Sequence, residues 1–188
     1  MPIAQETPRA VRSAGVVVFH LSSCVLVAAL LASAPAHGGP PQVADIDTLT
    51  RCASVIFEGD VLDVSSAWNQ DHNQIRTRVD LAVSQCYKGS TRGGHINIQF
   101  LGGTVDEITM AVLDQPTFSP GEHVFLFLAP NHEDRDVPLV AGDQGKLLVT
   151  QDPTSRAEMI SSPYLSIPKA DAVKRIDQIM QPVLHGSR

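Results

Sequence analysis

Alternating apolar and polar positions form the clearest pattern in the chain, between residues 54 and 101. Within 75–87, Ile75, Thr77, Val79, Leu81 and Val83 fall on one side of an extended backbone, whereas Arg76, Arg78, Asp80 and Ser84 fall on the other. Successive side chains of a strand point to opposite faces, so this alternation predicts a half-buried strand. Segments 54–68 and 95–101 share the pattern, and a glycine inside the first, Gly59, predicts a bulge or bend there.

Further along the chain, short apolar runs separated by turn-rich segments predict more strands. Residues 122–130 are almost continuously apolar, which is typical of a strand buried on both faces. Residues 104–113 predict a fourth strand, and 137–142 and 145–150 predict closing strands. Five to seven strands without βαβ alternation indicate a mainly β fold, a small antiparallel barrel or sandwich. We favour an OB-like barrel, because Gly59 and the pair Gly102–Gly103 supply the bends that closure needs.

Two segments carry helical spacing instead. Residues 45–53 place apolar side chains three apart after Asp45, a suitable N-cap, and predict a short helix. Residues 169–180 form an amphipathic helix near the end of the chain. The expected organisation is a flexible segment 37–44, a barrel domain 45–150, and a C-terminal extension 151–188 that contains this helix.

The first 36 residues follow the layout of a signal peptide. Arg9 and Arg12 precede an apolar run at 14–31, and small residues follow it. Cleavage between Ala36 and His37 fits best, which predicts a secreted or periplasmic protein without an integral membrane span.

Two other interpretations of this segment stay open. A membrane anchor would need a longer run than this one, which His20 interrupts. A lipoprotein is the second alternative, because Leu21–Cys24 resembles a lipobox, although the apolar run continues beyond Cys24.

Composition and charge narrow the possible partners. The net charge is −6, and no run of basic residues occurs, so nucleic acid is not an expected partner. If Cys24 leaves with the signal peptide, Cys52 and Cys86 remain as a candidate disulfide in an oxidising compartment. The alternative is a pair of buried thiols that act as small apolar side chains.

No catalytic, cofactor or metal site can be assigned from motifs. The histidines show no HxxxH or HxH pairing, and those at strand starts and loop tips, such as His95, His123 and His132, are expected to be solvated. The oxygen-rich loops 69–73 and 131–134 are interpreted as polar turns. Cys86 is the one candidate nucleophile, and adjacent Asp106 and Glu107 would face opposite sides of a strand.

Residues 52–89 resemble the opening of the netrin-like module of tissue inhibitors of metalloproteinases. The shared features are a cysteine, the strand SVIFEGDVLDV, a polar hairpin, and a second strand that ends in a Lys-Gly turn. The resemblance implies a five-stranded OB-type barrel. Its inhibitory mechanism does not carry over, because that family binds the protease zinc through an N-terminal cysteine, whereas the expected mature terminus here is His37.

A longer stretch, about 44–150, resembles uncharacterised exported bacterial proteins. The shared segments are Trp68–Asn69, Tyr87–Gly89, Leu101–Thr104, Pro116–Leu128 and Gln144–Lys146. Together these observations predict an exported, non-enzymatic domain that binds a protein, such as a protease, or an extracellular polymer. Alternatives are a hydrolase, which a deep pocket lined by His123, Glu122 or Asp106 would favour, and a structural envelope component. The oligomeric state is not predicted.

Overall fold

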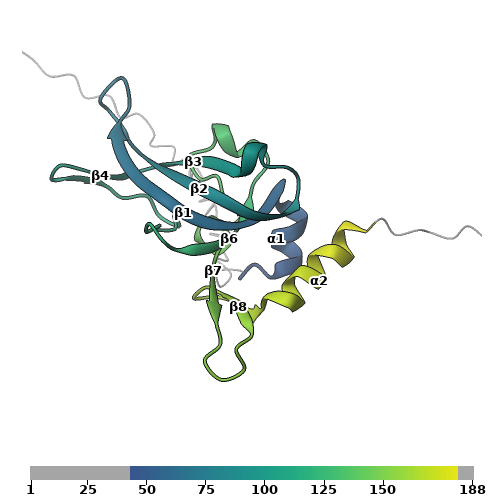
Figure 1. The fold of residues 1–188 in the computed structure, drawn as a ribbon. Coiled ribbons are helices and arrows are strands. Elements are labelled where there is room, and N and C mark those ends of the chain that lie inside the picture. Colours follow the sequence, from purple (N-terminus) through teal and green to yellow (C-terminus); the bar gives the residue numbers. More distant parts are fainter. Residues whose placement is uncertain (1–42, 182–188) are drawn as a thin grey trace, which may run out of the picture. The chain divides into compact units, whose positions relative to one another are not determined.

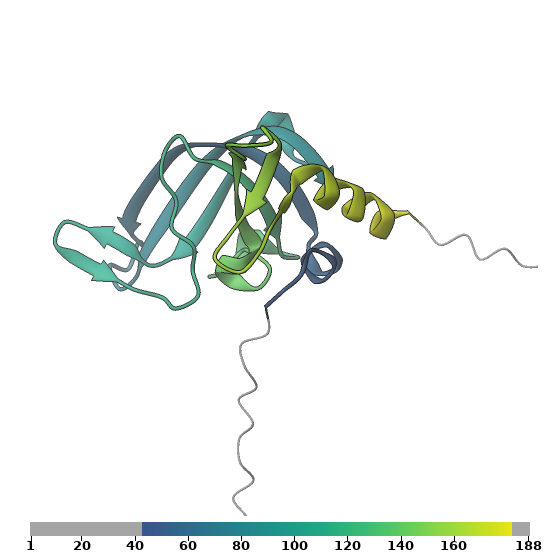
Figure 2. The ribbon, with the colours of Figure 1, turned by 90° about the horizontal axis from the view of Figure 1, so that it is seen from below.

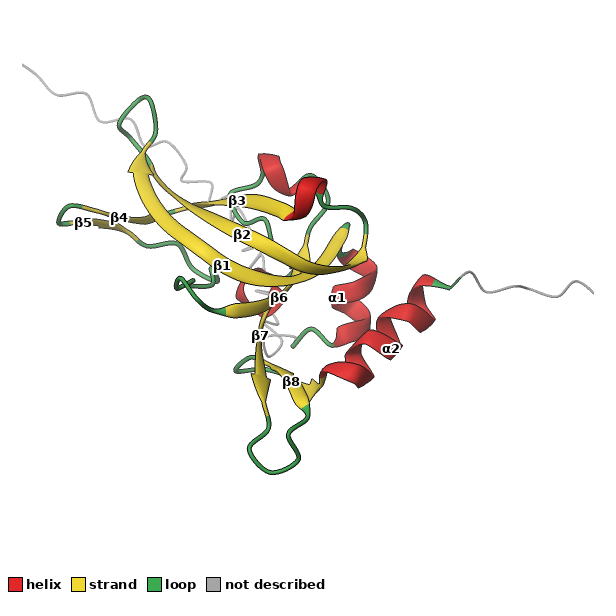
Figure 3. Ribbon diagram, in the orientation of Figure 1, coloured by secondary structure: helices red, strands yellow, loops and turns green. Residues whose placement is uncertain are grey.

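A computed structural model describes residues 43–181, in which strands predominate (Figure 3). Seven strands form one antiparallel sheet in the order β3-β2-β1-β6-β7-β8-β9, and two more form a separate hairpin, β4–β5 (Figure 1). The strands are β1 (Val55–Trp68), β2 (Ile75–Lys88), β3 (His95–Leu101), β4 (Gly103–Val105), β5 (Ile108–Met110), β6 (His123–Leu128), β7 (Lys146–Gln151), β8 (Glu158–Ser161) and β9 (Ser166–Pro168). The helices are α1 (Ile46–Cys52) and α2 (Lys169–Met180), with single 3-10 turns at η1 (Arg92–Gly94), η2 (His132–Asp134) and η3 (Gly142–Gly145).

The central strands confirm the apolar patterns of the sequence. On β2, Ile75, Val79 and Leu81 are fully buried, and all residues of β6 from Val124 to Leu128 are buried as well. The register of β1 against β2 shifts at Glu58/Gly59, which confirms the predicted bulge. Glycine is required there, because a Cβ at Gly59 would lie 2.3 Å from the carbonyl oxygen of Ala82.

Each face of the sheet packs into its own apolar cluster. On the first face, Ile56, Phe125 and Phe127 pack with side chains from both helices, including Leu49 of α1 and Ile176 of α2. On the second face lie Phe57, Val61, Val79, Leu81, Ile98, Phe100, Val124, Leu126 and Leu128. Alternate residues of β6 therefore serve different clusters, which is why its sequence is apolar throughout.

Polar side chains cap α1 and link it to α2. The carboxylate of Asp45 accepts a hydrogen bond from the backbone N–H of Thr48 at 2.8 Å, so Asp45 caps α1 as predicted. Arg175 of α2 donates to both carboxylate oxygens of Asp47 in α1 at 2.6 Å, a two-pronged arrangement that sets their relative orientation.

Two of the predicted strands are wrong in detail. Residues 104–113 do not form one strand, because Asp106 adopts φ +53° and the chain turns back into the β4–β5 hairpin. Asp106 and Glu107 are thus turn residues rather than opposite-facing strand residues. Segment 137–142 contributes only an isolated bridge between Leu139 and Leu128. The sheet also continues past residue 150 through β8 and β9.

The established architecture is a mainly β domain with an antiparallel sheet and two helices. Within residues 43–181 no ladder joins the edge strands β3 and β9, so the sheet is not closed into a barrel. Segment 136–140 nevertheless lies between two strands: Leu101 of β3 donates its N–H to Asp136, and Val140 donates to Phe127 of β6.

The predicted signal peptide 1–36 with Cys24, the cleavage site at Ala36–His37, and most of the segment 37–44 lie outside the described residues. Ala44 is described, and its N–H donates to the side-chain oxygen of Gln144 at 2.7 Å. Neither helix within 43–181 has the length and apolarity required to cross a membrane.

Candidate functional site

Glu58 of β1 is the centre of a polar cluster at the rim of the first face. Only 5% of this residue is exposed, and its carboxylate accepts three hydrogen bonds. The Tyr87 hydroxyl donates to one oxygen at 2.7 Å, while His123 Nε2 at 2.7 Å and Lys169 Nζ at 3.0 Å contact the other. The donors come from β2, β6 and α2, so this carboxylate joins three separate elements.

His123 bridges two carboxylates. Its Nε2 contacts Glu58, and its Nδ1 lies 2.6 Å from Asp60, two residues further along β1. A carboxylate can only accept, so both ring nitrogens must donate and the ring is an imidazolium. Burial by itself would lower the pKa of His123, but the bonds to Glu58 and Asp60 outweigh it and raise the pKa above 6.5.

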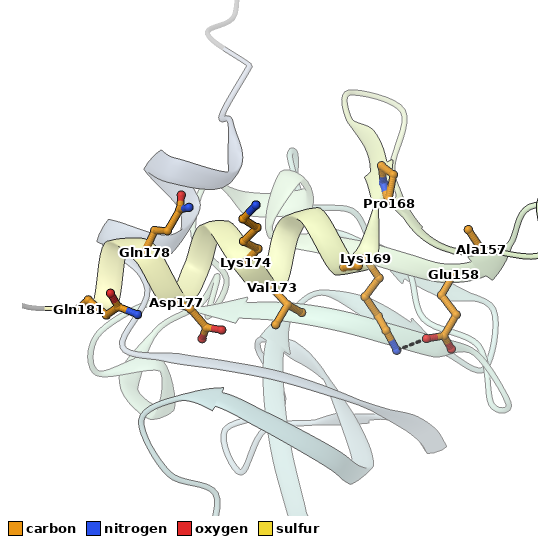
Figure 4. A pocket seen from close by; sticks show the side chains of 10 residues that line it. Ala157, Glu158, Pro168, Lys169, Val173, Lys174, Asp177, Gln178 and Gln181 are labelled. Carbon is orange, nitrogen blue, oxygen red and sulfur yellow. Dashed lines mark ion pairs between the residues drawn. The ribbon is translucent and has the colours of Figure 1, made fainter.

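Lys169, the first residue of α2, links the buried carboxylate of Glu58 to the protein surface. Its Nζ contacts Glu58 and also the exposed carboxylate of Glu158 on β8, at 2.6 Å. Figure 4 shows this lysine reaching from the start of α2 toward Glu158, at one end of an open groove along the helix. Burial would lower the pKa of Lys169, but its two carboxylate partners raise it.

The same interactions keep Glu58 ionised. Burial alone would raise the pKa of this carboxyl, yet the bonds from Tyr87, His123 and Lys169 outweigh burial and hold the pKa below 4.5. Burial, followed by the bond to Glu58, raises the pKa of Tyr87. The cluster is therefore suited to holding elements together rather than to proton transfer. Its tyrosine stays protonated, the acceptor sites of its carboxylate are occupied, and its histidine is hydrogen-bonded through both ring nitrogens.

His123 therefore corrects the sequence interpretation, which expected a solvated histidine. Neither Glu122 nor Asp106 converges with it. Glu122, the residue before β6, pairs instead with Lys146 of β7 at 2.6 Å, and Asp106 lies in the β4–β5 turn. The pocket that would favour a hydrolase is not formed by these three residues.

The predicted disulfide is also corrected, because both thiols are free. Cys52 is exposed at the end of α1, which packs on the first face of the sheet. Cys86 packs against the cluster on the second face, and its thiol donates to the carbonyl oxygen of Lys88 at 3.3 Å. The alternative of two buried thiols does not hold either, since Cys52 is exposed.

Both oxygen-rich loops are polar turns, as predicted. The side-chain oxygen of Asn69 accepts bonds from the backbone N–H groups of Asn73 and Gln74, and His72 stacks on Trp68 with 6.4 Å between ring centroids. Asn131 adopts φ +54° at the start of η2. Over residues 43–181, no group of three or more His, Cys, Asp or Glu side chains is placed to hold a metal ion.

A second candidate site is the surface formed by residues 103–118, which comprise the β4–β5 hairpin and the strap that follows it. This 103–118 surface projects at one end of the domain, and α2 lies at the other (Figures 1 and 2). It presents two large apolar side chains to solvent, Leu113 at 88% exposure and Ile108 at 56%. Neither was singled out from the sequence, because apolar residues in a presumed strand are expected to be buried.

A glycine allows the hairpin to lie against the long β1–β2 pair. A Cβ at Gly103 would lie 2.2 Å from Thr77 Oγ1 and 2.5 Å from Ser66 Oγ. The Thr77 hydroxyl donates to the carbonyl of Gly102 at 2.7 Å and contacts the Ser66 hydroxyl at 2.8 Å, so Ser66 is the donor in that pair. The two hydroxyls hold the hairpin in place, and the absence of a side chain at Gly103 allows this close approach.

The strap is ordered by contacts with three other parts of the domain. Asp143 donates its N–H to the carbonyl of Asp114 at 2.9 Å, and the amide of Gln115 donates to Asp136 at 3.1 Å. The Lys146 ammonium bonds the carbonyl of Thr117 and lies 4.4 Å from the Phe118 ring centroid. Leu113 is therefore exposed on a segment that is held in place just after it.

Between this strap and the sheet lies a groove of about 480 Å³. Its lining is apolar or uncharged and includes Val64, Thr77, Phe100, Ala111, Val112 and Phe118. Grooves of this size and lining are typical of places where a ligand or a partner side chain is received.

A comparison of the sequence with models of known protein families finds no matching family, and a comparison with curated proteins finds no matching relative.

Proposed function

We propose that this chain is an exported, non-enzymatic binding domain that recognises a secreted or periplasmic protein, such as a protease, through its 103–118 surface. The observation that carries this proposal is the ordered strap, which exposes Leu113 beside an uncharged groove. An exposed apolar patch on an ordered segment is typical of a protein interface, because docking removes it from water without a large cost of ordering.

The netrin-like and exported-protein resemblances support the same class of function. We infer an OB-like barrel in which segment 136–140, bonded to both β3 and β6, completes the wall that the strand ladders leave open. OB-folds bind their ligands with the face of two strands and with loops between strands. The amino-terminal cysteine of the inhibitor family has no counterpart at the expected terminus, so the proposed contact is made by the hairpin and strap instead.

A comparative pull-down from the periplasm and culture supernatant of the producing cells tests the proposal. The bait is the mature chain, and the matched variants are I108E/L113E and L62E. Leu62 is similarly exposed, at 51%, but it belongs to β1 and lies outside segment 103–118. We expect a partner that the wild type and L62E both retain and that I108E/L113E loses. A partner retained equally by all three baits would show that the 103–118 surface is not the binding site.

A further inference from the structure

The charges on the 103–118 surface define the chemistry of its partner further. Segment 103–118 contains Asp106, Glu107 and Asp114 but no Lys or Arg. None of the three carboxylates takes part in an ion pair with another described residue. A fourth carboxylate, Asp143, lies beside the strap, where its N–H bonds the carbonyl of Asp114.

Basic side chains of β2 and β7, two strands that contact this surface, are already engaged. Arg76 pairs with Asp136 at 2.9 Å, and Arg78 pairs with Asp80 at 3.0 Å. Lys146 pairs with Glu122. The surface therefore combines an uncharged groove and two exposed apolar side chains with negative charge that the domain itself does not neutralise.

We propose that the groove of the 103–118 surface receives a cationic partner segment, in which one aliphatic or aromatic side chain is flanked by Lys or Arg. The apolar side chain would occupy the groove between Phe100 and Val112, and the flanking cations would lie over Asp106, Glu107 and Asp114. This inference rests on the proposed binding function and adds the chemical class of the partner. A second copy of this chain is the less suitable occupant, because it would bring a net charge of −6 to an acidic surface.

The strap of this chain does not have to become ordered when the partner segment binds. The strap contacts at Asp114, Gln115 and Thr117 exist without a partner, so docking would not have to order it. Long-range attraction between the carboxylates and a cationic segment would act mainly on the association rate and would weaken as salt is raised.

A random 12-residue peptide library displayed on phage is the probe, selected on the full mature chain. Two variants alter the site. A111W places a large ring at an exposed position that lines the groove. D106N/E107Q/D114N removes the three charges, and asparagine tolerates the positive φ of Asp106 and Asp114. The charge-matched control is E133Q/D134N/D177N, which removes three exposed carboxylates that lie outside this surface and take part in no described ion pair.

We expect the selected peptides to share an aliphatic or aromatic residue next to Lys or Arg. Binding should weaken about tenfold or more in A111W and in the charge-removal variant, and about twofold or less in the control. Peptides that need the open groove but carry no basic residues would overturn the cationic partner and leave the proposed function standing. Selected peptides that bind A111W as well as the wild type would overturn the groove as the site. So would a selection in which the wild type enriches no peptides beyond those that A111W enriches. The pull-down with I108E/L113E tests the proposed function separately.

Discussion

Glu58 occupies a position where an apolar residue would be expected, between buried neighbours on β1. A buried carboxylate is tolerated only when donors replace the water that it loses, and here Tyr87, His123 and Lys169 do so. None of these donors is close to Glu58 in sequence. The residue alone therefore looks like a defect in an apolar strand, and only its neighbours explain it.

Replacing Glu58 with Gln should destabilise the domain strongly. E58Q leaves His123 and Lys169 without their shared charge partner, and we expect a loss on the order of 3 kcal/mol in the free energy of unfolding. E158Q is the matched control, because Glu158 pairs with the same lysine but is 55% exposed in its side chain. Its loss should stay below about 1 kcal/mol. Chemical denaturation measures both, and equal losses would contradict the central role of Glu58.

The protonated state of His123 should make stability depend on pH. The folded protein raises the pKa of His123, so its contribution is complete below the ordinary histidine pKa of about 6.5 and is lost as pH rises through the raised value. We therefore expect the free energy of unfolding to decline as the pH rises from about 6.5 through the raised pKa of His123, and to decline less in H123N. H95N, at an exposed histidine, serves as the control. Identical slopes for wild type and H123N would argue against an imidazolium.

At the scale of elements, the β4–β5 hairpin depends on close approach at Gly103. Both Gly103 and Gly121 adopt positive φ, at +136° and +87°, but a Cβ at Gly121 would meet nothing within 4 Å. G121A should therefore lower the free energy of unfolding by about 1 kcal/mol, because only its backbone is strained. G103A adds steric overlap with Ser66 and Thr77, so its total loss should be about 2–4 kcal/mol.

Hydrogen exchange locates this effect. In G103A we expect faster exchange in β4, β5 and the strap, while β6 keeps its protection because it lies in the centre of the sheet. Uniformly faster exchange throughout the domain would mean that the hairpin is not a separate unit.

At the scale of the whole molecule, export and the state of the cysteines can be measured on one sample. If export removes the first 36 residues, as proposed, the intact mass of the product corresponds to residues 37–188, with both remaining thiols unpaired. Brief alkylation of the native protein should label exposed Cys52 faster than Cys86, which is only partly exposed. A mass two hydrogens lower than that of the dithiol form, together with no alkylation of either cysteine, would show that Cys52 and Cys86 form the disulfide.

Much of the central sheet was predictable from short-range patterns. The alternation on β2, the continuous apolar run of β6 and the cap at Asp45 depend on residues that are neighbours in sequence, so their effects can be read locally. The β4–β5 hairpin was missed because its turn depends on Asp106, a non-glycine residue with positive φ. Strands β8 and β9 were missed because they are short and obtain their stability from pairing, β8 with β7 and β9 with β8.

The sequence by itself determined the strand-rich class, both helices, the bulge at Gly59 and the acidic balance of charge, because each follows from composition or from local periodicity. Tertiary structure alone decided which charged groups meet: Glu58 and Lys169 are 111 residues apart, and Glu58 and His123 are 65 apart. It also decided that Cys52 and Cys86 stay unpaired and that Leu113 remains exposed. These outcomes depend on how separate elements pack, because burial and charge pairing are properties of three-dimensional neighbours rather than of neighbours along the chain.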